Sequence, residues 1–101
     1  MVDSRRLKEM KSTAVLVNTA RGGIVDEEAL YHALKEGEIG AAALDATLVE
    51  PACGSPLAAL PNCILTPHAG AATYEAGRNM GMLAAQNVLD VLTTGTCPHL
   101  V

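Results

Sequence analysis

Residues 14–28 read Ala-Val-Leu-Val-Asn-Thr-Ala-Arg-Gly-Gly-Ile-Val-Asp-Glu-Glu. The run 14–17 is continuously apolar and rich in β-branched residues, which suits a strand that is buried on both faces. Asp26 is placed to cap a helix, and the two glutamates after it lie at the positive end of the helix dipole. A strand that leads through a short polar loop into a helix is the repeating unit of parallel sheets covered by helices.

The rest of the chain continues this alternation. We expect a short helix at residues 4–10, strands at 39–44 and 63–65, a proline-punctuated loop at 51–61, and a long amphipathic helix at 73–92. The helix that begins at Asp26 ends at Gly37, and the long helix ends at Thr94-Gly95. Three strands are few for a parallel sheet, so the sequence predicts half of a doubly wound α/β domain whose other strands are supplied elsewhere.

Composition excludes several classes of protein. Half of the 101 residues are apolar, the formal net charge is -4, and the seven Lys and Arg residues form no stripe, so a nucleic-acid partner is not expected. Three cysteines without C-x-x-C spacing predict no disulfide framework and favour a reducing compartment. There is no long uncharged apolar run, so we expect a soluble, cytoplasmic protein with no membrane partner.

Three charged side chains follow the predicted strands: Arg21, Glu50 and His68. Parallel strands end at one edge of the sheet, where open α/β sheets bind ligands. The planar guanidinium of an arginine can bind both oxygens of a carboxylate through two parallel hydrogen bonds. If Glu50 is the partner of His68, the carboxylate fixes the tautomer and favours the protonated imidazole, as a proton donor requires.

Purely structural roles remain open for these residues. Arg21 could pair with Asp26 or Asp45 to hold its loop, and His68 taken alone is more often structural. Asp45, at the end of the second strand, could accept a hydrogen bond from a ligand or cap a loop. We expect no metal site. A site with His68 and Glu50 as ligands would also need Cys97 and His99, and the Cys97-Pro98-His99 segment has no second closely spaced pair of ligands to complete the usual spacing.

Four blocks of the sequence resemble the C-terminal part of the D-isomer-specific 2-hydroxyacid dehydrogenases. They are residues 16–27 (LVNTARGGIVDE), residues 42–45 (AALD), Glu50-Pro51, and residues 65–70 (LTPHAG). The resemblance covers nearly the whole chain. That family includes phosphoglycerate dehydrogenases and glyoxylate and hydroxypyruvate reductases. The resemblance implies the C-terminal half of a Rossmann-type doubly wound parallel sheet that ends in a long helix.

The resemblance also implies roles for single residues. Arg21 would bind the substrate carboxylate, His68 would exchange a proton with the substrate oxygen, and Glu50 would hold His68. Hydride would pass between a small 2-oxo or 2-hydroxy acid and the nicotinamide of NAD or NADP. The expected cofactor-binding residues are Thr19, Ala20, Arg21, Asp45, His68, Ala69 and Gly70, with Asp45 on the carboxamide.

One expected motif is missing, because no G-x-G-x-x-G occurs in the chain. Residues 1–101 are therefore expected to be the C-terminal part of the NAD(P)-binding catalytic domain. The glycine-rich half and the substrate domain would belong to the rest of a parent chain that is a homodimer when complete. We expect the isolated segment to be inactive.

Two alternative functions stay open. One is an NAD-sensing, corepressor-like binding protein on the same scaffold. The other is a small α/β binding domain in which Arg21, Glu50 and His68 are structural.

Overall fold

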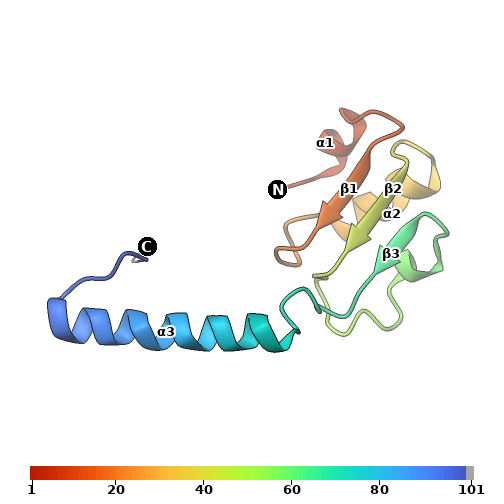
Figure 1. Cartoon of the computed structure of the whole chain (residues 1–101). Coiled ribbons are helices and arrows are strands. Elements are labelled where there is room, and N and C mark those ends of the chain that lie inside the picture. Colours follow the sequence, from red (N-terminus) through yellow and green to blue (C-terminus); the bar gives the residue numbers. More distant parts are fainter. Residues whose placement is uncertain (100–101) are drawn as a thin grey trace. The chain divides into compact units, whose positions relative to one another are not determined.

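The computed structural model describes residues 1–99, and the chain divides into two compact units, residues 1–70 and residues 71–101. Figure 1 labels the elements. The first unit contains α1 (Ser4–Lys8), β1 (Val15–Asn18), α2 (Glu27–Lys35), β2 (Ala41–Leu44), the short 3-10 helix η1 (Pro56–Ala59) and β3 (Cys63–Leu65). The second unit contains α3 (Tyr74–Thr94). The predicted alternation of helices and strands is confirmed.

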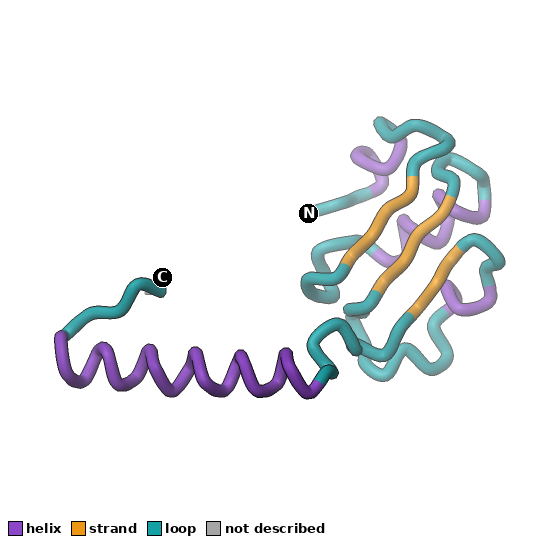
Figure 2. The backbone as a smooth tube through the Cα atoms, in the orientation of Figure 1, coloured by secondary structure: helices purple, strands orange, loops and turns teal. Residues whose placement is uncertain are grey.

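The three strands form one parallel sheet in the order β1-β2-β3 (Figure 2). Val15 pairs with Ala41 across the first ladder, and Ala43 pairs with Ile64 across the second. The second strand begins two residues later than the sequence predicts. Ile39, at the start of the predicted run, is buried in the turn before the strand.

The sheet is buried on one face in the first unit. Its helix-facing residues Ala42 and Leu44 pack into a core with Leu7 of α1, Leu30 of α2 and Leu57 of η1. All three helices of this unit contribute to that core, and α1 and η1 both contact α2. Figure 1 shows α2 behind the sheet.

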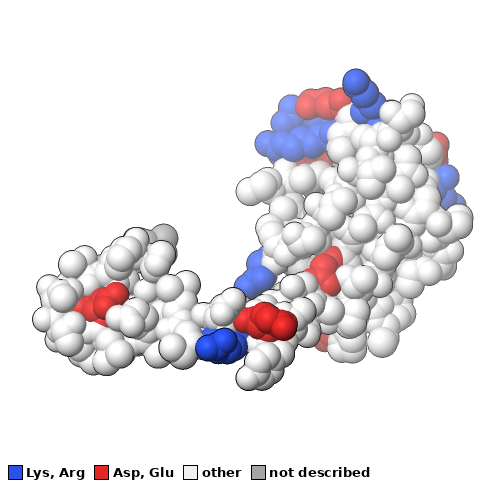
Figure 3. Space-filling model, viewed as in Figure 1, with Lys and Arg blue, Asp and Glu red and all other residues white. Residues whose placement is uncertain are grey.

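The prediction that the first strand is buried on both faces is wrong for this unit. Val15 and Val17 are 62% and 64% exposed, and Ile64 of β3 is 65% exposed. The reason is that alternate residues of a strand point to opposite faces, and the helices of this unit cover only one of them. Figure 3 shows that most of the surface in this view carries no charge, and that the basic side chains over α1 are mixed with acidic ones.

Helix ends follow the capping residues that the sequence indicates. The Asp26 carboxylate accepts a hydrogen bond from the Ala29 N–H at 3.0 Å, and Gly37, just beyond α2, takes the left-handed conformation with φ 73°. In the second unit, Thr73 caps α3 through the Ala76 N–H, and Gly95 ends it with φ 81°. The predicted long helix is confirmed over 21 residues.

None of the helices among residues 1–99 is both long enough and apolar enough to cross a membrane. The three cysteines are free thiols. Burial raises the pKa of the half-buried Cys63 thiol, and the nearby Glu27 carboxylate adds to that effect.

Candidate active site

Three loops meet at the carboxyl edge of the sheet, because β1, β2 and β3 run in parallel and are neighbours (Figure 2). The loop after β1 carries Arg21, the loop after β2 carries Asp45 and Glu50, and the loop after β3 carries His68. This edge is where open α/β sheets place their ligand sites. The candidate site is therefore built from residues that are far apart in the sequence.

The central contact of the site joins His68 to Glu50. The Nδ1 atom of His68 lies 2.9 Å and 3.0 Å from the two carboxylate oxygens of Glu50. An ionised carboxylate only accepts hydrogen bonds, so Nδ1 carries a proton in this contact. The two side chains are 38% and 42% exposed. Nε2 of His68 is then the ring nitrogen that remains to act on a ligand.

Thr47 holds the loop that presents Glu50. Its backbone N–H donates to Oε1 of Glu50 at 3.3 Å, and its hydroxyl donates to the Val49 carbonyl oxygen at 3.0 Å. Thr47 is only 7% exposed. A buried residue thus fixes the turn from which the Glu50 carboxylate reaches the histidine.

Asp45 organises the loop that carries His68. One carboxylate oxygen accepts the Thr66 hydroxyl at 2.5 Å and the Ala69 N–H at 2.8 Å, and the other accepts the Gly70 N–H at 2.9 Å. The Thr66 hydrogen bond, followed by those of the two amides, holds the pKa of Asp45 below its usual value. His68 itself has a left-handed backbone, with φ 54°. Asp45 therefore acts as a loop anchor, which was one of the two roles left open by the sequence.

Asn18 joins the arginine loop to the loop after β2. Its side chain is 6% exposed and donates to the Arg21 carbonyl at 2.9 Å and to the Ala46 carbonyl at 3.4 Å. Its amide oxygen accepts the Ala20 N–H at 3.1 Å. Sequence reasoning treated Asn18 only as the end of a strand. A polar residue that closes a buried run, where an unpaired amide would be costly, was the available signal.

The Arg21 side chain is exposed, and its Nη1 atom donates a hydrogen bond to the Ala20 carbonyl oxygen at 2.7 Å. Among residues 1–99 it forms no ion pair, so the pairing with Asp26 or Asp45 that the sequence left open is not found. Within residues 1–99, four of the five guanidinium N–H groups have no hydrogen-bond acceptor. They are available to a carboxylate ligand.

Gly22 lies against the backbone of the loop that carries Glu50. A Cβ atom at this position would overlap the Thr47 carbonyl group and lie 2.6 Å from the Leu48 nitrogen. The arginine loop and the glutamate loop are therefore in backbone contact. Only a residue without a side chain permits that approach.

The other predicted site residues lie at the same edge. Thr19, Ala20, Ala69 and Gly70 are all exposed. Asp45 uses three of the roughly four acceptor positions of a carboxylate, which leaves one for a ligand. The small exposed residues leave room for a flat ring, and the remaining acceptor position of Asp45 could bond to an amide N–H on that ring. No glycine-rich loop for a pyrophosphate occurs in the sequence, so these residues fit only the nicotinamide end of a dinucleotide.

Metal-ligating residues do not cluster in the part of the chain that the structure describes. Residues 1–99 contain no group of three or more His, Cys, Asp or Glu residues arranged to hold a metal ion. Two members of the set considered from the sequence, Cys97 and His99, lie in the second unit, whereas Glu50 and His68 lie in the first.

Comparisons with known proteins show which family the chain belongs to. Residues 1–70 match the family model described as D-isomer specific 2-hydroxyacid dehydrogenase, NAD binding domain. The chain is 48% identical over 92 residues to a D-3-phosphoglycerate dehydrogenase of Methanocaldococcus jannaschii, covering 91% of the chain and 18% of that protein. It is also 48% identical over 102 residues to a glyoxylate reductase of Thermofilum pendens, covering 100% of the chain and 30% of that protein.

Solved structures give the same result. A glyoxylate/hydroxypyruvate reductase of Sinorhizobium meliloti, in complex with NADP and malonate, matches with a TM-score of 0.82 at 35% identity over 93% of the chain and 30% of that protein. A D-lactate dehydrogenase of Lactobacillus jensenii with NAD+ matches with a TM-score of 0.78 at 37% identity over 100% of the chain and 34% of that protein. The chain thus spans less than a third of the two curated relatives. It belongs to the D-isomer specific 2-hydroxyacid dehydrogenase family and has the fold of that family's NAD-binding domain.

Proposed function

We propose that this chain supplies the acid–base residue and the substrate-carboxylate site of an NAD(P)-dependent oxidoreductase. The enzyme would transfer a hydride between the nicotinamide and carbon 2 of a D-2-hydroxy or 2-oxo acid. The observation that carries the proposal is the contact of His68 Nδ1 with both oxygens of Glu50, at 2.9 Å and 3.0 Å. It leaves Nε2 as the proton-exchanging atom on a ring of fixed tautomer.

In the direction of reduction, His68 begins as the imidazolium. NAD(P)H, when bound, supplies the hydride that adds to the carbonyl carbon of the 2-oxo acid. The Nε2 proton of His68 passes to the carbonyl oxygen, which becomes the 2-hydroxyl, and the imidazole is left neutral with Nδ1–H still bonded to Glu50. Glu50 stabilises the charged ring before transfer and keeps its orientation afterwards.

Arg21 binds the carboxylate of the acid in this proposal. Its guanidinium is exposed and forms no ion pair within residues 1–99, so no ion pair has to be broken when the carboxylate binds. The N–H donors of the planar guanidinium can bond to both oxygens of a carboxylate. These two hydrogen bonds would place the adjacent carbonyl carbon and oxygen at a fixed distance from the loop that carries His68.

The nicotinamide end of NAD or NADP would lie against the Asp45 side chain and the backbone around two segments. These are Thr19, Ala20 and Arg21, and His68, Ala69 and Gly70. Asp45 would accept the carboxamide N–H at its one spare acceptor position. The proposal also assigns residues 1–101 to the C-terminal part of a catalytic domain. A glycine-rich phosphate loop and a substrate domain would complete it, in a homodimeric cytoplasmic enzyme.

A segment exchange tests the proposal. Residues 1–101 replace the matching segment of the Thermofilum pendens glyoxylate reductase, and the purified hybrid is assayed for oxidation of NADH and NADPH with glyoxylate. We expect the hybrid to turn over glyoxylate. In the Arg21→Gln variant of the hybrid, the KM for glyoxylate should rise while the affinity for the cofactor is unchanged. A hybrid that folds and binds the cofactor but shows no turnover would favour the non-catalytic alternatives.

A further inference from the structure

The loop from Ala46 to Glu50 is packed only at its start. Ala46 and Thr47 are 1% and 7% exposed, whereas Leu48 and Val49 are 70% and 72% exposed, so the apolar side chains of its second half do not hold it against the core. An open pocket adjoins this half of the loop. Its volume is about 310 Å³ and its lining includes Leu48, Val49 and Glu27, so packed atoms do not back the loop there. The buried Thr47 therefore fixes the start of the loop, and a further contact is needed to hold residues 48–50.

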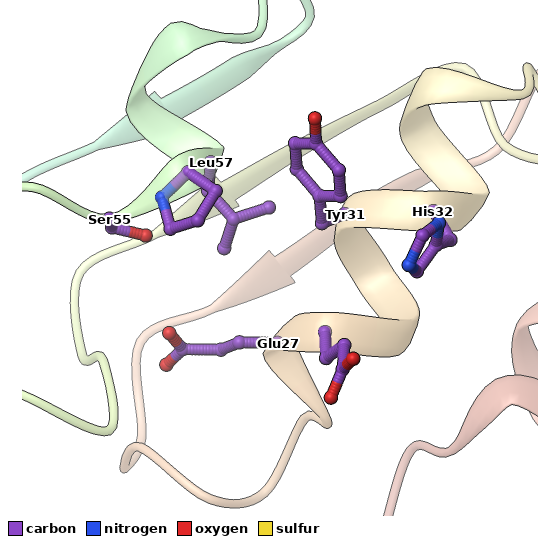
Figure 4. Close-up of a pocket in the computed structure, with 7 residues that line it drawn as sticks. Glu27, Tyr31, His32, Ser55 and Leu57 are labelled. Carbon is purple, nitrogen blue, oxygen red and sulfur yellow. The ribbon is translucent and has the colours of Figure 1, made fainter.

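Glu27 supplies a contact to this loop from another element. Its carboxylate accepts a hydrogen bond from the Leu48 backbone N–H at 2.5 Å, across 21 residues of sequence. Figure 4 shows the Glu27 side chain extended from the first turn of α2, toward the side of the pocket where Ser55 lies. That pocket, of about 520 Å³, also has Glu27 in its wall. The half-buried Glu27 thus lines both pockets.

The contact with Glu27 adjoins the one that holds Glu50. The N–H of Leu48 is bonded to Glu27, and the preceding N–H, that of Thr47, is bonded to Oε1 of Glu50. The two amides are consecutive in the chain, so a displacement of one displaces the other. The same Oε1 atom accepts the bond from His68.

We propose that Glu27 is a positioning residue that holds residues 46–50, and with them the Glu50 carboxylate, in place beside His68. The role rests on the function proposed above, because it matters only where Glu50 and His68 act as a pair. A hydrogen bond from an amide to a carboxylate is about twice as strong as one between neutral groups. A glutamine at position 27 retains an acceptor oxygen, whereas an alanine retains none.

The neighbouring Glu28 gives a matched control. It lies in the same first turn of α2 and is exposed, and its carboxylate accepts no hydrogen bond within residues 1–99. Replacing Glu27 or Glu28 therefore removes a similar favourable charge from the helix N-terminus. Only the Glu27 replacement removes the acceptor for Leu48.

The test is NMR spectroscopy on the full 101-residue chain with the variants Glu27→Ala, Glu27→Gln and Glu28→Ala. In Glu27→Ala we expect the protection of the Leu48 amide from hydrogen exchange to fall about tenfold, as loss of a charge-assisted hydrogen bond predicts. We expect the His68 ring nitrogen shifts to move toward those of a Glu50→Gln variant. Glu27→Gln and Glu28→Ala should both retain the His68 signals of the parent chain.

Unchanged Leu48 protection and unchanged His68 signals in Glu27→Ala would overturn the proposal, as would an equal effect in Glu28→Ala. If Glu27→Ala does not fold, the parent chain decides the question. A scalar coupling across the hydrogen bond must then be seen between the Leu48 amide nitrogen and the Glu27 carboxylate carbon, and its absence overturns the role. None of these measurements uses turnover, so a failure of the proposed oxidoreductase function is seen separately, in the segment exchange.

Discussion

Replacing Gly22 by alanine should separate the loop of Arg21 from the loop of Glu50. A Cβ atom there would lie 2.6 Å from the Leu48 nitrogen and closer still to the Thr47 carbonyl, whereas ordinary contact begins at 3.4 Å. The obstacles are backbone atoms that no rotamer change can remove, so the loops must part by about 1 Å. Gly22 is not among the glycines with positive φ, so the clash is the main cost.

The size of the effect follows from what that displacement breaks. Overpacking of this kind costs about 1–3 kcal/mol of the free energy of unfolding. The Leu48 N–H would move away from Glu27, and the Thr47 N–H would move away from Glu50. In a working enzyme a misplacement of about 1 Å at the reacting groups lowers the rate roughly 100-fold.

The assay combines urea denaturation, followed by circular dichroism, with the ring nitrogen signals of His68. Gly23→Ala is the matched control, because its Cβ would lie 3.8 Å from the nearest atom, the Leu48 Cδ1, but its φ is +76°. That variant should lose about 1–2 kcal/mol through backbone strain and keep the His68 signals. A Gly22→Ala chain with unaltered stability and unaltered His68 signals would refute the reasoning.

Three further outcomes are expected. Leu30 is 0% exposed in the core, so Leu30→Ala should lower the free energy of unfolding by about 2–5 kcal/mol in urea. Loss of the helix cap in Asp26→Ala should lower it by about 1 kcal/mol, and an effect no larger than that of Glu28→Ala would contradict the capping role. The pKa of Asp45 is lower in the folded chain than its unfolded value of 3.8. Its ionised carboxylate therefore stabilises the fold fully above pH 3.8, and this stabilisation is lost as the pH falls through the pKa of the folded chain. The protection factor of the Gly70 amide, taken against the intrinsic exchange rate at each pH, should therefore fall once Asp45 is protonated, and should be lower in Asp45→Asn at neutral pH. Equal protection factors across that pH range would contradict the role of Asp45 as a loop anchor.

Local signals were sufficient to predict the elements. The continuous apolar runs mark the strands, and Asp26, Gly37 and Gly95 mark helix ends, because each of these signals acts within a few residues of its own position. The short η1 helix was not predicted. Its four residues lie in a loop rich in proline, where turn signals obscure a single helical turn.

The exposure of the sheet and the supports of the site could not be predicted in the same way. An apolar run such as 14–17 has the composition of a strand that is covered on two faces, but it does not say which elements cover them. The contact of Asn18 with Ala46 spans 28 residues, and that of Glu27 with Leu48 spans 21. Each depends on how two distant segments meet in space, so the sequence predicted Arg21, Glu50 and His68 but not Asn18 and Glu27, which support their loops.

The most direct test of the central claim is the turnover number of the segment-exchanged reductase with His68→Gln. This variant keeps a polar side chain of similar reach but cannot exchange a proton as imidazole does. The account predicts that kcat for glyoxylate falls by about 10²- to 10⁴-fold while the affinity for NADH or NADPH is unchanged. A kcat within about threefold of the unmutated hybrid, far less than general acid catalysis contributes, would contradict the claim that His68, held by Glu50, is the proton donor.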